Sequence, residues 1–117
     1  MCIRDSIKRI RKKDNNIVAV LPPAGQASAG SETEYVMLGA HYDHLGRGET
    51  GGFRIKGEEG MIHNGADDNA SGVSTLLEMA AQLAERRQSH PQEFQRGVIF
   101  SFWSGEELGL ILSLIHI

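Results

Sequence analysis

Three short clusters of histidine and acidic residues could together hold metal ions. Residues 64–72, NGADDNASG, set two adjacent acids in a turn that opens into an apolar-periodic helix. His41 and Asp43 end one strand-like run, and Glu106 and Glu107 end another. Imidazole and carboxylate groups are ligands that zinc takes from proteins. Because α/β proteins build their sites where strands meet loops at the edge of a sheet, the three clusters predict a metal site there.

Each cluster has a simpler interpretation when it is taken alone. Asp67 and Asp68 could cap the helix that follows them, since acids are favourable at a helix N-terminus. A His-x-Asp triplet is usually an exposed histidine beside an acid, and a Glu-Glu pair usually has no special role. The metal-site hypothesis therefore depends on finding all three clusters in one chain, each at the end of an element.

The spacing of His41 and Asp43 suits a metal ligand and its supporting residue. Because side chains alternate along a strand, these two point to one side while Tyr42 and His44 point to the other. An imidazole can bind metal through one nitrogen while a carboxylate two residues on accepts a hydrogen bond from the other nitrogen. Asp43 is therefore expected to orient His41. His44 is left with a loop or substrate-side role at most.

The two ends of the chain are predicted to be artificial. The first and last hexapeptides, MCIRDS and LSLIHI, can be encoded by one oligonucleotide read on opposite strands. That oligonucleotide resembles a transposon-end adapter used to prepare sequencing libraries. Residues 1–6 and 112–117 are therefore expected to be scars, to be left out of fold reasoning. Cys2 then carries no information on redox compartment, and His116 is not a candidate ligand.

Composition gives only broad limits. The 117 residues are 40% hydrophobic with a formal net charge of −3, which is typical of a globular piece of one domain or less. No apolar run approaches the roughly 20 residues needed to span a bilayer. The one basic cluster, residues 8–13, is short and is more simply a solvated surface segment. This balance argues against a nucleic-acid partner.

Three strands and one helix are expected to position the clusters. Residues 17–21 are β-branched and stop at Pro22, and residues 35–41 are nearly all apolar, as in a strand covered on both faces. These two strands are expected to pair as neighbours. Residues 97–103 predict a third, buried strand.

The helix after the acidic turn has the clearest periodicity. Asn69 or Ser71 can cap its start, and the basic pair 86–87 suits its carbonyl end. Pro91 ends it. Its apolar stripe is expected to comprise Val73, Leu76, Leu77, Ala80, Leu83 and Ala84.

A long glycine-rich connection, residues 46–65, separates the first two clusters and carries a strand-like piece at 53–56. Loops of this length are uncommon in compact domains unless they are functional or disordered. A loop bordering the site and a drifted surface hairpin are both open interpretations. His63 in this loop is expected to be solvated.

Together the motifs GAHYDHLG, NGADDNASG and SGEELG, in that order, resemble the aminopeptidase family of dizinc exopeptidases. Relatives in that family include leucyl aminopeptidase, glutaminyl cyclases and the transferrin receptor. The similarity covers about residues 15–110 and corresponds to the N-terminal half of the catalytic domain. It implies an α/β fold, a three-layer sandwich with a mixed β-sheet, truncated C-terminally. Residues 7–111 would then be the N-terminal part of a zinc peptidase domain.

The resemblance assigns a role to each site residue by position. His41 would be a terminal ligand to one zinc ion, with Asp43 as its orienting residue. Asp68 would be the carboxylate that bridges two zinc ions. Glu106 would be the catalytic general base, and Glu107 a terminal ligand to the other zinc.

Other implications of the resemblance concern the rest of the site and protein. A cis peptide is expected at Asp68-Asn69, with Asp67 as a supporting residue. The family pattern needs a further Asp and His after the Glu-Glu pair, so this fragment is expected to bind zinc poorly and to lack activity. The intact protein is expected to hydrolyse peptides with a zinc-activated water. It is expected to be secreted, periplasmic or membrane-associated.

Three alternatives stay open. Related dizinc deacylases and carboxypeptidases resemble an Asp-x-Lys-Gly pattern at the bridging acid, where this chain has Asp68 followed by Asn-Ala-Ser-Gly. A glutaminyl-cyclase-like acyltransferase would be expected to show Asp-Ser, which Asn69 disfavours. A metal-free, receptor-like relative would have lost ligands, whereas His41, Asp68, Glu106 and Glu107 are all present here.

Overall fold

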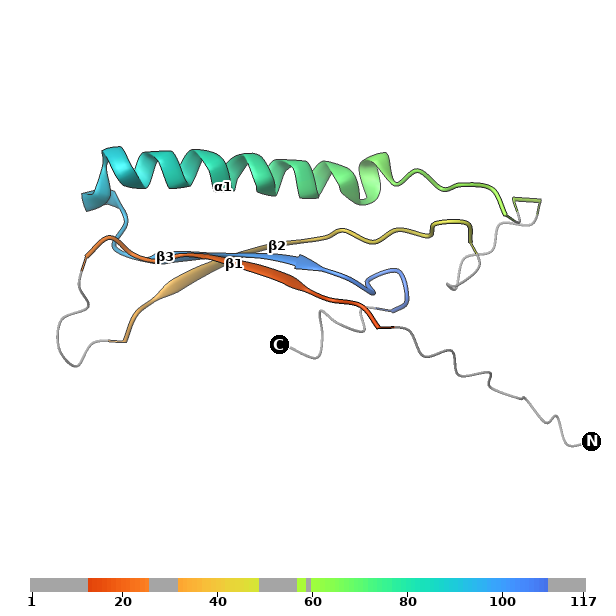
Figure 1. The fold of residues 1–117 in the computed structure, drawn as a ribbon, viewed down its shortest axis with the longest axis horizontal. Helices are drawn as coiled ribbons and strands as arrows, with labels where there is room; N and C mark the ends of the chain where they lie inside the picture. The colour runs from red at the N-terminus through yellow and green to blue at the C-terminus, as the bar shows by residue number, and fades with distance from the viewer. Residues whose placement is uncertain (1–12, 26–31, 49–56, 59, 110–117) are drawn as a thin grey trace, which may run out of the picture.

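The computed structural model describes three strands and one long helix. In chain order these are β1 (Ile17–Leu21), β2 (Tyr35–His41), α1 (Gly72–Ser89) and β3 (Gly97–Trp103) (Figure 1). An irregular helical turn, Ala66–Ser71, leads into α1, and a short turn, Pro91–Glu93, follows it. The described residues are 13–25, 32–48, 57–58 and 60–109. The predicted adapter-encoded ends, 1–6 and 112–117, and the strand-like piece 53–56 lie outside them.

The three strands have the predicted bounds, but their order differs from the expectation. The sheet order is β1-β3-β2, with β1 antiparallel and β2 parallel to the central β3. The expectation that β1 and β2 pair directly was therefore wrong. β3 is the most buried of the three and gains most from a neighbour on each side. β1 is exposed and is followed by Pro22, which suits an edge strand.

The core lies between α1 and one face of the sheet. Leu76 of α1 packs on Ala40 of β2 and on Phe100 and Phe102 of β3, and all four are buried. The predicted stripe is correct for most of its members. Leu77 is the exception, because it lies just over a quarter of a turn round the helix from Leu76 and is 57% exposed. Partly buried side chains around this centre are Leu21, Leu38, Val73, Ala80, Leu83 and Val98.

Replacing Leu76 with alanine is expected to destabilise the fold by about 2–5 kcal/mol, because the truncation leaves a cavity at the centre of the core. Leu77→Ala removes the same atoms from a neighbouring, exposed position, and is expected to change the free energy of unfolding by no more than about 0.5 kcal/mol. Urea unfolding of both variants measures the difference. Equal losses would place the core elsewhere on α1.

The other face of the sheet carries exposed apolar side chains. Val18, Val20 and Met37 are each more than half exposed. Their positions alternate with those of the core residues on the same strands, so their side chains lie on the face that α1 does not cover. The described residues therefore give one helical layer on a mixed sheet, which confirms an α/β arrangement. The three-layer sandwich stays a prediction. No described helix combines the length and the apolar character needed to cross a membrane.

The parallel pairing of β2 with β3 decides where the predicted site residues lie. His41 pairs with Trp103, so both strands end together and their following loops leave from one edge of the sheet. The helix α1 runs back over the sheet and begins at this same edge (Figure 1). Three segments that are distant in sequence, 41–48, 65–71 and 104–109, are thereby brought together.

Candidate metal site

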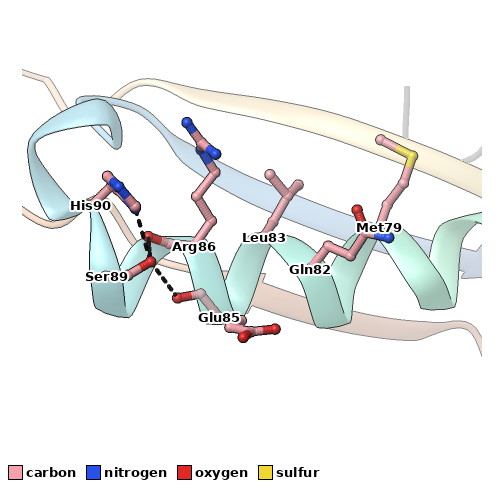
Figure 2. Close-up of a pocket in the computed structure, with 7 residues that line it drawn as sticks. All are labelled: Met79, Gln82, Leu83, Glu85, Arg86, Ser89 and His90. Carbon is pink, nitrogen blue, oxygen red and sulfur yellow. Dashed lines mark hydrogen bonds between the residues drawn. The ribbon is translucent and has the colours of Figure 1, made fainter.

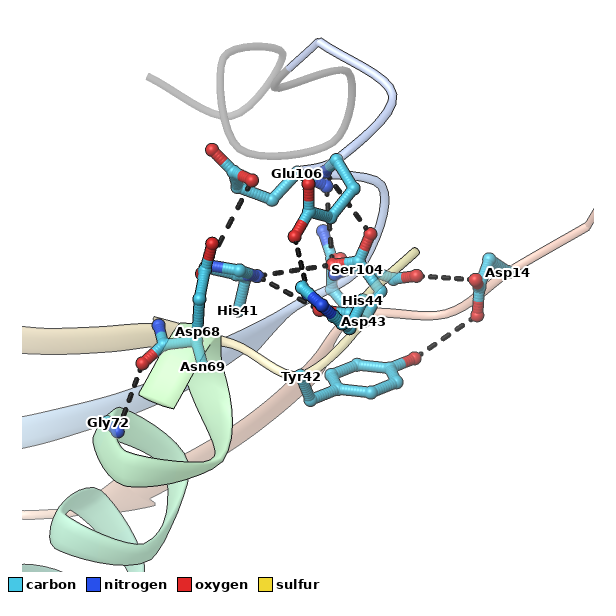
Figure 3. Close-up of polar contacts among 12 residues, drawn as sticks. Asp14, His41, Tyr42, Asp43, His44, Asp68, Asn69, Gly72, Ser104 and Glu106 are labelled. Atoms are coloured by element: carbon cyan, nitrogen blue, oxygen red, sulfur yellow. Dashed lines mark hydrogen bonds and ion pairs between the residues drawn. The ribbon is translucent and has the colours of Figure 1, made fainter. Parts of the chain in front are cut away.

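His41 is the centre of the polar cluster at this edge (Figure 3). Its Nε2 lies 3.0 Å from Oδ1 of Asp68 and 3.9 Å from Oε2 of Glu106. Its Nδ1 lies 3.1 Å from the backbone carbonyl oxygen of Asp43. A carbonyl oxygen only accepts hydrogen bonds, so Nδ1 carries a proton and Nε2 is the ring nitrogen that faces the carboxylate acceptors of Asp68 and Glu106. A cation between these acceptors, either a proton or a metal ion, relieves their repulsion.

Asp43 supports the site differently from the expectation. Its carboxylate Oδ1 is 3.6 Å from His41 Nδ1, and the closer contact to that nitrogen is the Asp43 backbone carbonyl. The carboxylate oxygens instead accept the backbone N–H groups of Glu106 and Glu107, at 3.3 and 3.4 Å. The strand ends at His41, so strict alternation of side chains does not extend to Asp43. Asp43 therefore joins the loop after β2 to the loop after β3.

Asp68 projects from the turn before α1, and its side chain is 67% exposed. The Asp68-Asn69 peptide bond is cis, as the resemblance implied. Asn69 caps the helix as expected, since its Oδ1 accepts the backbone N–H of Gly72 at 3.0 Å. Ser71 does not act as a cap, because its hydroxyl donates to the Asp67 carbonyl at 2.6 Å.

His44 belongs to the cluster, which corrects the expectation that it faces away. Its Nδ1 is 2.7 Å from Oε1 of Glu107. The cause is again the end of β2 at His41, after which the chain no longer alternates. His44, Asp68 and Glu107 each offer a ligand atom within 4.8 Å of the others. The only sequence signal for this role is that His44 lies within the GAHYDHLG motif itself.

The predicted ligands and the predicted base thus lie at one edge of the sheet. Asp68 is shared by two groups: it contacts His41, and it also forms the compact trio with His44 and Glu107. A carboxylate with nitrogen or oxygen ligands on both sides suits a bridging position between two cations. Histidine nitrogen with carboxylate oxygen is a donor set that zinc accepts. The residues present therefore fit zinc chemically.

A second polar network, on the other side of the loops, was not predicted (Figure 3). The hydroxyl of the fully buried Ser104 donates to Asp14 Oδ2, and its backbone N–H donates to Asn16 Oδ1 at 3.0 Å. The Tyr42 hydroxyl lies 3.1 Å from Asp14 Oδ1 and donates to the Asn15 carbonyl at 2.5 Å. Residues before β1 thereby tie together the loop that follows His41 and the loop that carries Glu106. The polar segment around Asp14 gives no sequence signal for contacts 90 residues away.

Asp14 is expected to make the stability of these loops depend on pH. The hydrogen bond from Ser104, followed by that from the Asn15 backbone, lowers the pKa of Asp14 below its ordinary value of 3.8. A lowered pKa in the folded state adds stability above pH 3.8, which is lost as the pH falls through the folded-state pKa. Asp14→Asn is therefore expected to flatten the acid limb of the pH–stability curve.

The measurement is thermal unfolding of wild type and Asp14→Asn between neutral pH and about pH 2. Glu85→Gln is the control, because it removes one exposed carboxylate from α1 and keeps every Asp14 contact. An acid limb of unchanged steepness in Asp14→Asn would mean that this network adds no stability that depends on the Asp14 charge.

A hollow at the opposite end of α1 lacks the features of the metal site (Figure 2). Its one histidine, His90, contacts the Ser89 hydroxyl at 2.9 Å. Arg86 is paired with Glu93 through a 2.6 Å contact. The residues that line it are Met79, Gln82, Leu83, Glu85, Arg86, Ser89 and His90. We therefore place the candidate functional site at the His41 end of the sheet.

Comparison with known proteins gives one family and one curated relative. The sequence model described as Peptidase family M28 matches residues 16–114. The probable lipoprotein aminopeptidase LpqL of Mycobacterium tuberculosis is 33% identical over 99 residues. That alignment covers 85% of this chain and 15% of LpqL, so the chain spans about a seventh of the length of this relative. No solved structure matches the chain.

Proposed function

This chain belongs to Peptidase family M28, and on that premise we propose that it is part of a zinc-dependent exopeptidase that removes residues from peptide N-termini. The aminopeptidase assignment is supported by the similarity to LpqL, whose name states that activity. Two zinc ions are proposed for the site. His41 and Glu107 would be their separate ligands, and Asp68 would bridge them.

The observation that carries this proposal is the position of Asp68. It lies 3.0 Å from Nε2 of His41 and also within 4.8 Å of the ligand atoms of His44 and Glu107. These residues come from three segments that are distant in the sequence: the end of β2 and its following loop, the turn before α1, and the loop after β3. A bound cation would stabilise this arrangement, because every group that faces Asp68 here is a potential metal donor.

Glu106 is proposed as the general base, the residue that transfers a proton from water during peptide hydrolysis. Its Oε2 lies 3.9 Å from His41 Nε2, and its side chain is 32% exposed, so the carboxylate borders both the cluster and solvent. Zinc, when bound, polarises a peptide carbonyl and makes water acidic enough to react near neutral pH. Glu106 would take the proton from the attacking water and deliver it to the amine that leaves. Asp43 would hold the backbone at Glu106 in place.

Two further proposals concern the rest of the protein. The remaining Asp and His ligands would come from chain beyond the Glu-Glu pair, so residues 1–117 alone would bind zinc weakly and hydrolyse no peptide. The protein would act in the cell envelope or outside the cell, a location supported by the description of LpqL as a lipoprotein.

The test uses the protein that carries these residues together with the rest of the catalytic domain. We expect two zinc ions per chain by elemental analysis, and hydrolysis of aminoacyl anilides that stops with a zinc chelator and returns with zinc. N-acetylated versions of the same anilides are the control and should resist cleavage. Hydrolysis that survives complete zinc removal, or that prefers the blocked anilides, would refute the proposal.

A further inference from the structure

We propose that His44 is a positioning residue that holds the carboxylate of Glu107 through its Nδ1. This inference rests on the proposed function, in which Glu107 is a zinc ligand. Nδ1 of His44 lies 2.7 Å from Oε1 of Glu107, and the two side chains are 23% and 13% exposed. An ionised carboxylate only accepts, so Nδ1 donates the proton in this bond. The nitrogen that donates cannot at the same time offer its lone pair to a metal.

The ring of His44 is held on its other side by the turn that carries Asp68. A Cβ atom added to Gly65 would lie 2.8–2.9 Å from three atoms of the His44 side chain, so the ring rests directly against this glycine. Gly65 has a φ of 64° and immediately precedes the irregular turn at Ala66–Ser71. His44 therefore fills the space between the Asp68 turn and Glu107.

Glu107 is thus fixed at both its backbone and its side chain. Asp43 Oδ2 accepts its backbone N–H at 3.4 Å, while His44 holds the end of the side chain. Both supports come from the loop after β2, the strand whose last residue is His41. Without His44 the Glu107 carboxylate could take other rotamers, and the ligand set around Asp68 would have to be ordered when metal binds. The predicted consequence is weaker metal binding.

Two amide substitutions distinguish the two ring nitrogens. The amide nitrogen of asparagine lies close to the place of Nδ1, whereas that of glutamine lies close to the place of Nε2. In the full protein, His44→Gln is expected to weaken the affinity for zinc by about 10–100-fold, the usual cost of losing a residue that orients a ligand. His44→Asn is expected to recover most of that loss. His63→Gln is the matched control, since His63 contacts the Gly46 carbonyl only through its backbone and should bind zinc as wild type does.

Zinc affinity measured by competition with a chromogenic chelator is the first readout, and it does not require activity. Wild-type affinity in His44→Gln overturns the inference. Equal losses in the Asn and Gln variants also overturn it, because they would indicate that His44 is itself a ligand. If wild-type protein binds no zinc, the proposed function fails. The inference is then decided by crystal structures of metal-free wild type and His44→Gln, where an unmoved Glu107 carboxylate would refute it.

Discussion

Glu106→Gln is expected to lower the turnover of the intact peptidase by about 10²–10⁴-fold while leaving its zinc content unchanged. The substitution keeps the size of the side chain but removes its ability to take a proton from water. Glu106 sits at the border between the cluster and solvent, 3.9 Å from His41 and with its backbone held by Asp43. The glutamine variant should therefore keep the shape of the site. The loss should fall in kcat more than in KM, since the proton moves only during reaction.

Glu107→Gln is the matched comparison, because it makes the same chemical change at the next residue. It should lose zinc, since its carboxylate lies in the trio with His44 and Asp68. Elemental analysis and steady-state kinetics on both variants separate the two roles. If Glu106→Gln is the variant that loses zinc, the assignments of base and ligand are reversed. If both variants turn over normally, neither residue has the proposed role.

Asp68→Asn is expected to abolish binding of both zinc ions, with a loss of affinity above the roughly 100-fold that follows removal of a residue that only orients a ligand. The Asp68 carboxylate contacts His41, and it also belongs to the trio of His44, Asp68 and Glu107. An amide keeps the volume but supplies one neutral oxygen in place of two charged ones. Both ions should therefore be lost together, and activity with them.

The neighbouring Asp67→Asn is the control for this prediction. It removes one negative charge from the same turn, and its backbone carbonyl still accepts the Ser71 hydroxyl. Zinc titration by calorimetry should give two sites in Asp67→Asn and none in Asp68→Asn. One ion retained by Asp68→Asn would contradict a bridging role, and loss of both ions in Asp67→Asn would move the essential carboxylate one residue back.

Local sequence patterns were sufficient for the elements but not for their pairing. The bounds of β1, β2 and β3 follow from short apolar runs bordered by proline, glycine or polar residues, and the helix after the acidic turn follows from its period. The order of the strands depends on which strand gains most from two neighbours. That is a property of the whole sheet, so proximity along the chain wrongly suggested a β1–β2 pair. Leu77 was misassigned because a count of apolar spacings does not fix how wide the buried stripe is.

For the site, the sequence identified the segments that converge, but not the directions of the side chains that follow the end of β2. His41, Asp68 and Glu106 were expected to converge, and their side chains do lie together. Beyond His41 the alternation rule no longer applies, and for that reason the place of His44 and the contacts of the Asp43 carboxylate were missed. The roles of these residues as ligands, base and supports stay predictions until metal binding is measured. The Asp14 network could not be anticipated, because its partners are set only once the sheet has formed.

The central position of β3 has a consequence for how the protein is made. β3 is the last of the three described strands to leave the ribosome, and in the described sheet β1 and β2 each pair with it alone. Residues 42–96 separate β2 from β3, so their pairing closes a long loop and is expected to be slow. Until Trp103 has emerged, the apolar strands stay unpaired and open to association with other nascent chains. The candidate metal site is then expected to form late, because its residues come together only when β3 pairs with β1 and β2.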